Sequence, residues 1–227
     1  MTTDTSLDKG HRARLRARFL KADHEQFADY ELLEMLLFAS NPRGDVKPLA
    51  KNLLATFGNF ARVLSAPSEQ LIAVKGMGEA AIAHFKVAQE SAARLVRAEI
   101  LDTPLLNSGD KVKAYCHARM AYLDREQFRL LYLDRKNQLM LDEVQQQGTV
   151  DHIAVYPREV MRRALELGAS ALILVHNHPS GDPTPSTADI DLTNQIHEAA
   201  KSLSITLHDH LIIGKSGSYS FRERGLL

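Results

Sequence analysis

The sequence predicts an α+β protein with two domains, a small all-α domain followed by an α/β domain. Apolar side chains recur at helical spacing through the first hundred residues, which contain few runs that favour strands. The segment at residues 101–108 contains Pro104 and interrupts that pattern. Beyond it, short apolar runs alternate with helical stretches. We therefore predict a helical domain at residues 1–104 and a mixed domain at residues 105–227.

The N-terminal domain is expected to consist of helices with identifiable ends. Residues 30–39 place four leucines on one face at helical spacing. Asp45 can cap the helix that follows it, and Gly58 can end that helix. The expected helical segments are residues 12–21, 30–39 and 45–57, followed by a short turn that Ser68 can open and that runs to Val74, and by a longer alanine-rich helix after residue 78 that runs to about residue 99.

The C-terminal domain is expected to contain a sheet with helices between some of its strands. The run ALILVH at residues 171–176 is continuously apolar up to its final histidine, which is typical of a buried strand. The turn-like residues 134–137 predict a hairpin between two strands. The expected strands are residues 128–133, 138–144, 171–176, 205–213 and 219–221. The expected helices are residues 110–122, 157–168 and 186–202.

Composition excludes several classes of protein. The 227 residues are 44% hydrophobic and 25% charged with a formal net charge of zero, so global charge indicates neither a nucleic-acid nor a membrane partner. The single cysteine, Cys116, excludes a disulfide framework and a cysteine-based zinc site within one chain. No apolar run is long enough to span a membrane, and the first residues do not resemble a signal peptide. We expect a soluble cytoplasmic protein, and the sequence leaves its oligomeric state open.

One segment has the pattern of a metal site. His176 and His178 end the predicted buried strand, and alternation along a strand puts both imidazoles on one face. Asp189 follows one turn into the next predicted helix, after a loop rich in proline and glycine. Two histidines and one carboxylate leave a fourth tetrahedral position for water, as in catalytic zinc sites. Structural roles also account for part of this segment, since Ser186 could cap the helix and Asp189 could complete a capping-box-like pattern.

The same segment resembles a known motif. The string His-x-His-x7-Ser-x2-Asp, formed by His176, His178, Ser186 and Asp189, is similar to the JAMM (MPN+) metalloprotease motif at every fixed position. The wider sequence LVHNHPSGDPTPSTADIDLT resembles the RadC family, also called UPF0758, and the similarity continues through LHDHLIIG to the C-terminus. The helical half also resembles the N-terminal region of that family. This resemblance implies an α-β-α JAMM/MPN domain, similar to cytidine deaminases in fold, in the C-terminal half.

The resemblance also implies roles for individual residues. His176, His178 and Asp189 match the ligands of one Zn²⁺ per chain, and Ser186 matches a serine that stabilises an oxyanion. JAMM enzymes use a glutamate ahead of an early strand as general base; Glu126 occupies that place, and Glu143 is a second candidate. The implied activity is hydrolysis of a peptide or isopeptide bond in a polypeptide substrate. Many JAMM proteases have Ser or Thr where this chain has Asn177, which places isopeptidase specificity in question.

A second His-x-His pair stands at residues 208–210. Strand alternation again puts His208 and His210 on one face. Either Asp209 or His210 is a candidate for a group that orients a metal ligand. The alternative interpretation is a strand end with local hydrogen bonds.

The segment around Lys75, Gly76 and Gly78 resembles the hairpin of a helix-hairpin-helix module. Two glycines permit a tight turn, and backbone N–H groups at the start of the next helix can meet a DNA phosphate. The alternative is an ordinary turn between helices without a ligand. The competing function is therefore a DNA-associated protein, as the RadC family's repair-related name implies, in which the helical domain binds DNA.

Overall fold

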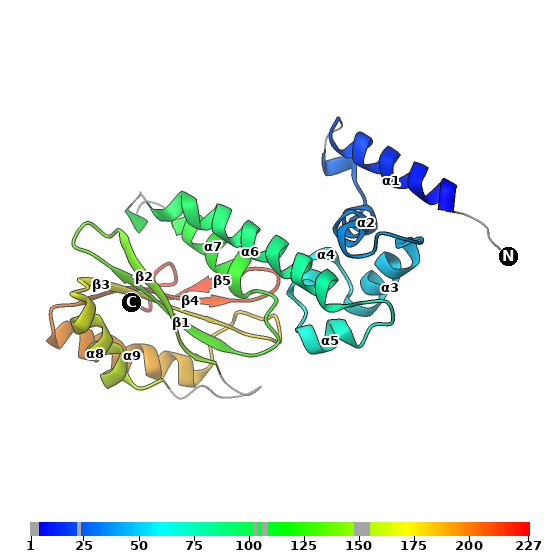
Figure 1. Cartoon of the computed structure of the whole chain (residues 1–227). Helices are drawn as coiled ribbons and strands as arrows, with labels where there is room; N and C mark the ends of the chain where they lie inside the picture. Colours follow the sequence, from blue (N-terminus) through cyan, green and yellow to red (C-terminus); the bar gives the residue numbers. More distant parts are fainter. Residues whose placement is uncertain (1–4, 22–23, 102–103, 106–108, 148–154) are drawn as a thin grey trace. The chain divides into compact units, whose positions relative to one another are not determined.

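A computed structural model describes residues 5–21, 24–101, 104–105, 109–147 and 155–227 (Figure 1). It confirms the α+β class, because helices make up the first part of the chain and a five-stranded sheet with helices makes up the second. The chain forms two compact units, Met1–Ser91 and Ala92–Leu227. Residues 102–103 and 106–108 of the predicted interdomain segment lie outside the described residues. No helix in the described ranges is long and apolar enough to cross a membrane.

The first unit is built from short helices around a leucine-rich core. Leu33, Leu37 and Leu53 are fully buried together with Phe85. The sequence did not lead us to expect the helix α4, which is only six residues long and begins where the Asn59 side chain accepts a hydrogen bond from the Arg62 N–H. The α-helices are α1 (Thr5–Phe19), α2 (Asp29–Ser40), α3 (Lys47–Phe57), α4 (Phe60–Ser65), α5 (Ser68–Ile72) and the beginning of α6 (Glu79–Leu101), whose residues from Ala92 on belong to the second unit, and a 3-10 turn covers His24–Gln26.

The second unit contains a mixed sheet with the strand order β2-β1-β3-β4-β5. Strands β3 and β4 are parallel and are connected through α9, whereas the other neighbouring pairs are antiparallel. The strands are β1 (Gln127–Leu133), β2 (Leu139–Gln147), β3 (Ala171–Asn177), β4 (Thr206–Ile213) and β5 (Ser218–Ser220). The helices are α7 (Gly109–Met120), α8 (Pro157–Leu167) and α9 (Thr187–Ser202).

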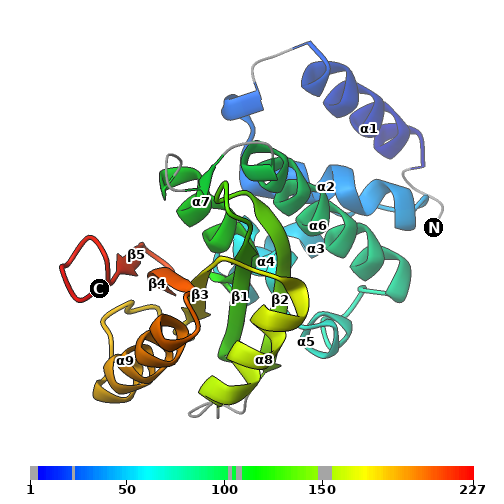
Figure 2. The same ribbon diagram turned by 90° about the vertical axis from the view of Figure 1, so that its left-hand side faces the viewer.

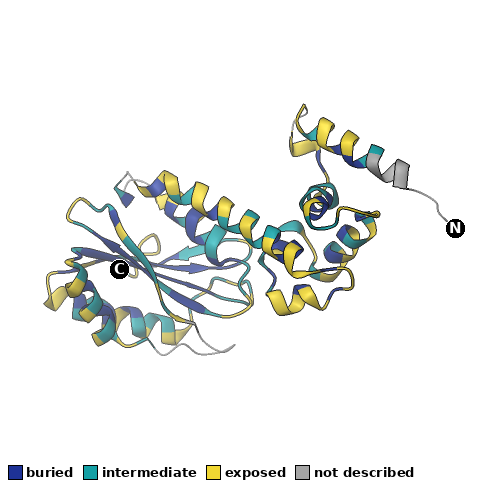
Figure 3. Cartoon of the chain, viewed as in Figure 1, coloured by how far each residue is buried: buried dark blue, intermediate teal, exposed yellow. Residues whose placement is uncertain are grey.

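Helices cover both faces of this sheet. Ile173 and Val175 of β3 pack in a cluster with residues of α7, whereas Leu172 and Leu174 pack in a second cluster with residues of α8 and α9. Figure 2 shows the sheet between α7 and the α8–α9 pair. Because both of its faces are covered, β3 is buried along its whole length, and Figure 3 shows this as a dark interior beneath helices with exposed outer faces. The central strand is therefore a rigid base for the residues at its end.

Candidate metal centre

The end of β3 places the two histidines of the first His-x-His pair on one face. The even-numbered residues Leu172 and Leu174 point toward α8 and α9, and His176 and His178 continue that alternation. The His176 ring stacks on Phe128 of the neighbouring strand β1, with ring centroids 6.0 Å apart. His176 is buried and His178 is partly exposed. The site is thus closed around His176 and open toward solvent at His178.

The loop after β3 is held so that α9 starts beside these histidines. Gly181 adopts φ +98°, and its carbonyl oxygen approaches Gly214 so closely that a Cβ at Gly214 would lie 2.3 Å from it. The Lys215 ammonium donates to the Pro179 carbonyl at 2.6 Å. At the helix start, the Ser186 and Asp189 side chains each accept from the other's backbone N–H. The capping role expected for Ser186 is present and itself brings Asp189 to the histidines.

Potential ligand atoms from three side chains converge at this place. The Nε2 atoms of His176 and His178 are 3.0 Å apart. The Asp189 Oδ1 lies 3.2 Å from His176 Nε2, and its Oδ2 lies 3.6 Å from His178 Nε2. Ligands bound about 2.0–2.1 Å from one zinc ion in tetrahedral geometry are separated by about 3.3 Å, so the observed spacings fit such an ion. No other group of three or more potential ligands comes together in the described part of the chain.

A backbone hydrogen bond orients the neutral ring of His178 toward the cluster. Its Nδ1 lies 2.8 Å from the Asp182 carbonyl oxygen, which can only accept, so the neutral ring carries its proton on Nδ1. The Nε2 lone pair of His178 therefore faces His176 and Asp189. When Nε2 is also protonated, its hydrogen bond to Asp189 raises the pKa of His178 despite the partial burial of the ring, so a proton and a cation compete for this nitrogen. Burial would raise the pKa of Asp189, but its hydrogen bonds with the two histidines and Ser186 hold it well below the ordinary range. These hydrogen bonds therefore favour the carboxylate form of Asp189.

Glu126 lies directly before β1, and Asn177 forms hydrogen bonds with the residues on both sides of it. The Asn177 side-chain oxygen accepts from the Gln127 N–H at 2.9 Å, and its side-chain nitrogen donates to the Arg125 carbonyl at 3.1 Å. Asn177 thereby holds the peptide groups on both sides of Glu126. The Glu126 charge contributes to raising the pKa of His178, which places the carboxylate within electrostatic reach of the candidate centre. Asn177 follows the alternation of β3, and its side chain contacts the start of β1 rather than the ligand atoms.

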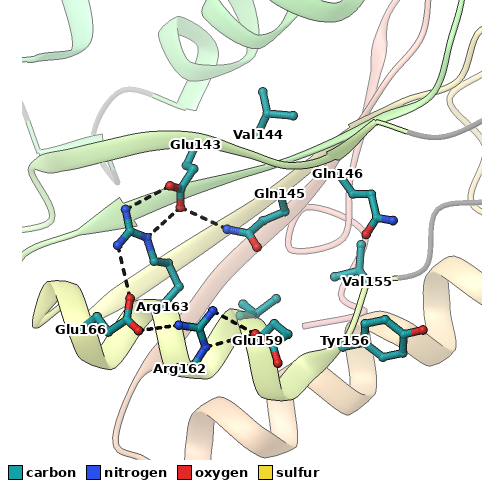
Figure 4. A pocket seen from close by; sticks show the side chains of 11 residues that line it. Glu143, Val144, Gln145, Gln146, Val155, Tyr156, Glu159, Arg162, Arg163 and Glu166 are labelled. Carbon is teal, nitrogen blue, oxygen red and sulfur yellow. Dashed lines mark hydrogen bonds and ion pairs between the residues drawn. The ribbon is translucent and has the colours of Figure 1, made fainter.

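Glu143, the second candidate base, has another partner. Both of its carboxylate oxygens accept from the Arg163 guanidinium at 3.0 Å. Figure 4 shows this pair beside a cavity of about 470 Å³ between β2 and α8, within a network that continues through Glu166 and Arg162 to Glu159. The sequence contained no signal for this pairing, which joins residues 20 positions apart. Glu143 is held by Arg163, so Glu126 is the stronger candidate for the base.

The Ser186 hydroxyl also has a partner in this structure. It donates to the Asp189 Oδ2 at 2.7 Å while its side chain remains exposed. As a donor to an oxyanion, Ser186 would have to exchange this hydrogen bond for one to the substrate. Its position beside Asp189 keeps the hydroxyl at the open side of the cluster.

The second His-x-His pair does not follow the expected alternation. The partner of Leu172 is Leu207, but the partner of Ile173 is Asp209, so β4 contains one extra residue, His208, relative to β3. This bulge turns His208 and Asp209 toward a cavity of about 290 Å³ that is also lined by Val112 of α7. His210 faces the opposite side, where its Nε2 lies 2.8 Å from His176 Nδ1. The prediction that His208 and His210 share a face is therefore wrong.

The other two side chains of this segment act away from the ligand atoms. His208 Nε2 contacts the Asn137 side-chain oxygen at 2.6 Å. The Asp209 carboxylate accepts from the Ser220 hydroxyl at 2.6 Å and from the Arg222 N–H at 3.0 Å, so it connects β4 to the end of β5. Burial raises the pKa of Asp209, although these hydrogen bonds oppose the effect. Of the two candidates for orienting a ligand, only His210 touches one in this structure.

The residues considered for DNA lie in the turn between α5 and α6. Lys75, Gly76 and Gly78 are exposed, and Gly76 adopts φ +97°. Val74 and Met77 are buried between them and are joined by a backbone hydrogen bond of 3.0 Å. This geometry presents Lys75 and the start of α6 to solvent. The role of the turn in DNA binding stays a prediction.

Comparison with known proteins relates both units to one family. The sequence matches the RadC-like JAB domain over residues 106–226 and the UPF0758 N-terminal domain over residues 8–83. A UPF0758 protein of Ruegeria pomeroyi is 58% identical over 219 residues, which cover 96% of this chain and 98% of that protein. A UPF0758 protein of Rhodobacter capsulatus is 57% identical over 213 residues, which cover 94% of this chain and 100% of that protein. The similarity therefore extends over nearly the whole chain.

Proposed function

The chain belongs to the RadC-like (UPF0758) family, and we propose that it is a single-zinc hydrolase that cleaves peptide or isopeptide bonds. The observation that carries this proposal is the convergence of His176 Nε2, His178 Nε2 and the Asp189 carboxylate at 3.0–3.6 Å from one another. The RadC-like JAB domain supports it, because this domain relates the C-terminal part of the chain to the JAMM family.

The donor set favours zinc over the harder cations. Two imidazoles and one carboxylate suit Zn²⁺, whereas Mg²⁺ and Ca²⁺ prefer ligands that are all oxygen. A two-metal nuclease needs bridging carboxylates, and the described residues bring only one carboxylate, that of Asp189, into the cluster. When bound, Zn²⁺ supplies Lewis-acid activation of water and of a substrate carbonyl. Three protein ligands leave room for such chemistry.

In the proposed reaction, Glu126 transfers the proton. Its carboxylate accepts a proton from the attacking water and later delivers it to the leaving nitrogen. The hydrogen bonds from Asn177 hold the backbone on both sides of Glu126, so only the side-chain torsions of Glu126 remain to be ordered during the reaction. Ser186 donates a hydrogen bond to the oxyanion after exchanging its bond with Asp189. The substrate enters from the side of His178, which is the open side of the site.

The test separates metal binding from catalysis. The full-length chain is purified without chelators, its zinc content is measured, and hydrolysis is followed with internally quenched peptides, both linear and branched through a lysine side chain. We expect about one zinc per chain and hydrolysis that a chelator abolishes. Glu126→Gln should keep the zinc and lower hydrolysis by roughly 100- to 10,000-fold.

The matched control is Glu143→Gln, which alters the other candidate carboxylate and should leave the rate within a few-fold of wild type. A chain that does not bind zinc, or a Glu126→Gln variant as active as wild type, contradicts the proposal. Failure to hydrolyse every linear and branched probe contradicts the proposed substrate class.

A further inference from the structure

A continuous row of hydrogen bonds runs from α9 through β4 to the candidate metal centre. The Thr193 hydroxyl lies 2.5 Å from the Asp189 backbone carbonyl and 2.6 Å from His210 Nδ1. His210 Nε2 lies 2.8 Å from His176 Nδ1. Thr193 and His210 are fully buried, and His176 is 1% exposed. The side chains of Thr193, His210 and His176 are shielded from solvent. Their hydrogen-bonding protons must therefore be shared among the partners in the row.

The distribution of protons follows from counting donors. The Asp189 carbonyl can only accept, so the single proton of the Thr193 hydroxyl points to it. The Thr193 oxygen is then an acceptor for His210, and His210 carries its proton on Nδ1. His210 Nε2 consequently bears a lone pair and accepts from His176 Nδ1–H. The remaining nitrogen of His176, Nε2, points to His178 Nε2 and Asp189 Oδ1, so it is the nitrogen that a cation in the cluster would meet.

The reversed arrangement is disfavoured by the same contacts. If the Thr193 hydroxyl donated to His210, its oxygen would face the Asp189 carbonyl oxygen at 2.5 Å without a proton between them. A doubly protonated His210 would place a charge in a fully buried site between Phe128 and Phe221. Beside the charged ring lies another imidazole, that of His176, rather than a carboxylate.

We propose that Thr193, acting through His210, fixes His176 in the tautomer whose Nε2 lone pair points at the cation. Thr193 and His210 are positioning residues, since neither lies in the ligand cluster. The Asp182 carbonyl does the same for His178 through a single hydrogen bond. The zinc ligand set is thereby organised before any ion binds, which lowers the cost of binding. The inference rests on the proposed function only in naming the cation; the tautomer is a property of the metal-free chain.

The direct test reads the tautomer in the full-length, metal-free protein. Long-range ¹H–¹⁵N correlation NMR of the histidine side chains distinguishes a ring protonated on Nδ1 from one protonated on Nε2. We expect a proton on Nδ1 of both His176 and His210, with assignments from the variants His176→Gln and His210→Gln. A His176 ring without a proton on Nδ1 in the wild-type protein would overturn the proposal, and this measurement needs no variant of Thr193 to fold.

The second test uses a matched pair of variants. Thr193→Val has the same shape without the hydroxyl, and Thr193→Ser keeps the hydroxyl. Zinc affinity, measured by competition with a chromophoric chelator, should fall by roughly 10- to 100-fold in Thr193→Val and stay within about threefold in Thr193→Ser. In the metal-free spectrum, Thr193→Val should lose the uniform Nδ1–H signature and Thr193→Ser should retain it. Wild-type affinity and spectrum in Thr193→Val would contradict the role of the hydroxyl.

Failure of this inference is distinguishable from failure of the proposed function. A wild-type chain that binds no zinc refutes the zinc hydrolase, while the spectrum of the metal-free chain still reports the tautomer. A chain that binds zinc but shows the same affinity and spectrum in Thr193→Val retains the proposed function and refutes the role of Thr193.

Discussion

Two His-x-His pairs lie on neighbouring parallel strands of one sheet, yet their side chains have different orientations and different partners. His176 and His178 at the end of β3 lie on the same face and contribute two converging nitrogens. His208 and His210 on β4 face opposite sides, because His208 is an extra residue in the register with β3. Only His210 reaches the centre, where it contacts His176 rather than the ligand cluster itself. Identical spacing thus produces a pair of candidate ligands in one strand and, in the other, a single residue that contacts one of them.

The difference teaches that strand alternation holds only while the register is regular. The last residues of β3 pair with β4 without interruption from Ile173 to Asn177, so sequence spacing reports their faces correctly. One inserted residue reverses the face of everything on one side of it. The middle residues differ as well: Asn177 supports the start of β1, and Asp209 supports the end of β5.

The sharpest test of this comparison removes one histidine from each pair. His178→Ala should weaken zinc binding by roughly 1000-fold, about 4 kcal/mol, because one of three ligands is lost. His208→Ala, the matched control, should keep wild-type zinc affinity, since its ring contacts Asn137 on the other side of the sheet. Zinc content after dialysis and chelator competition measure both. An equal loss of zinc affinity in the two variants would contradict the assignment of different roles to the two pairs.

A smaller effect is expected from the middle residue of the first pair. Asn177→Ala removes both hydrogen bonds that bracket Glu126 and should lower kcat by roughly 10- to 100-fold with the zinc content unchanged. Asn177→Asp keeps the acceptor for the Gln127 N–H but loses the donor to Arg125, so its rate should lie between those of wild type and Asn177→Ala. Steady-state kinetics with the quenched peptides provide the measurement, and loss of zinc in Asn177→Ala would contradict this role.

The middle residue of the second pair should affect stability rather than catalysis. Asp209→Ala leaves the Ser220 hydroxyl and the Arg222 N–H without their acceptor. We expect the free energy of unfolding to fall by about 1–3 kcal/mol, measured by urea denaturation of the metal-free chain. Zinc affinity should stay within a few-fold of wild type. A large loss of zinc with unchanged stability would instead give Asp209 a direct part in the centre.

The smallest effect concerns the short glycine motif in the other unit. If the turn between α5 and α6 binds DNA, as in the competing function, Lys75→Ala should weaken binding of the full-length chain to duplex DNA by less than about tenfold. The slope of its salt dependence should fall by about one, because one phosphate contact is lost. Fluorescence anisotropy with a labelled duplex at several salt concentrations measures both. Unchanged affinity and slope would remove Lys75 from any DNA-binding surface.

The sequence by itself determined the order of most of the elements, the buried character of β3 and the three side chains that come together in the candidate centre. These features depend on neighbours within a few residues. The two histidines are two residues apart at the end of a regular strand, and Asp189 lies three residues after Ser186, in the first turn of the helix that Ser186 caps. The short helix α4 was missed, because six residues carry too little periodicity to predict a helix.

Only the tertiary structure decided the roles that depend on pairing between distant segments. The bulge at His208 follows from the register between β3 and β4, and the pairing of Glu143 with Arg163 follows from the packing of α8 on β2. Asn177 accepts a hydrogen bond from the Gln127 N–H, 50 residues away, and Thr193 is hydrogen-bonded to His210, 17 residues away. Such contacts have no signature in local sequence spacing, because they are set by which strands and helices pack together.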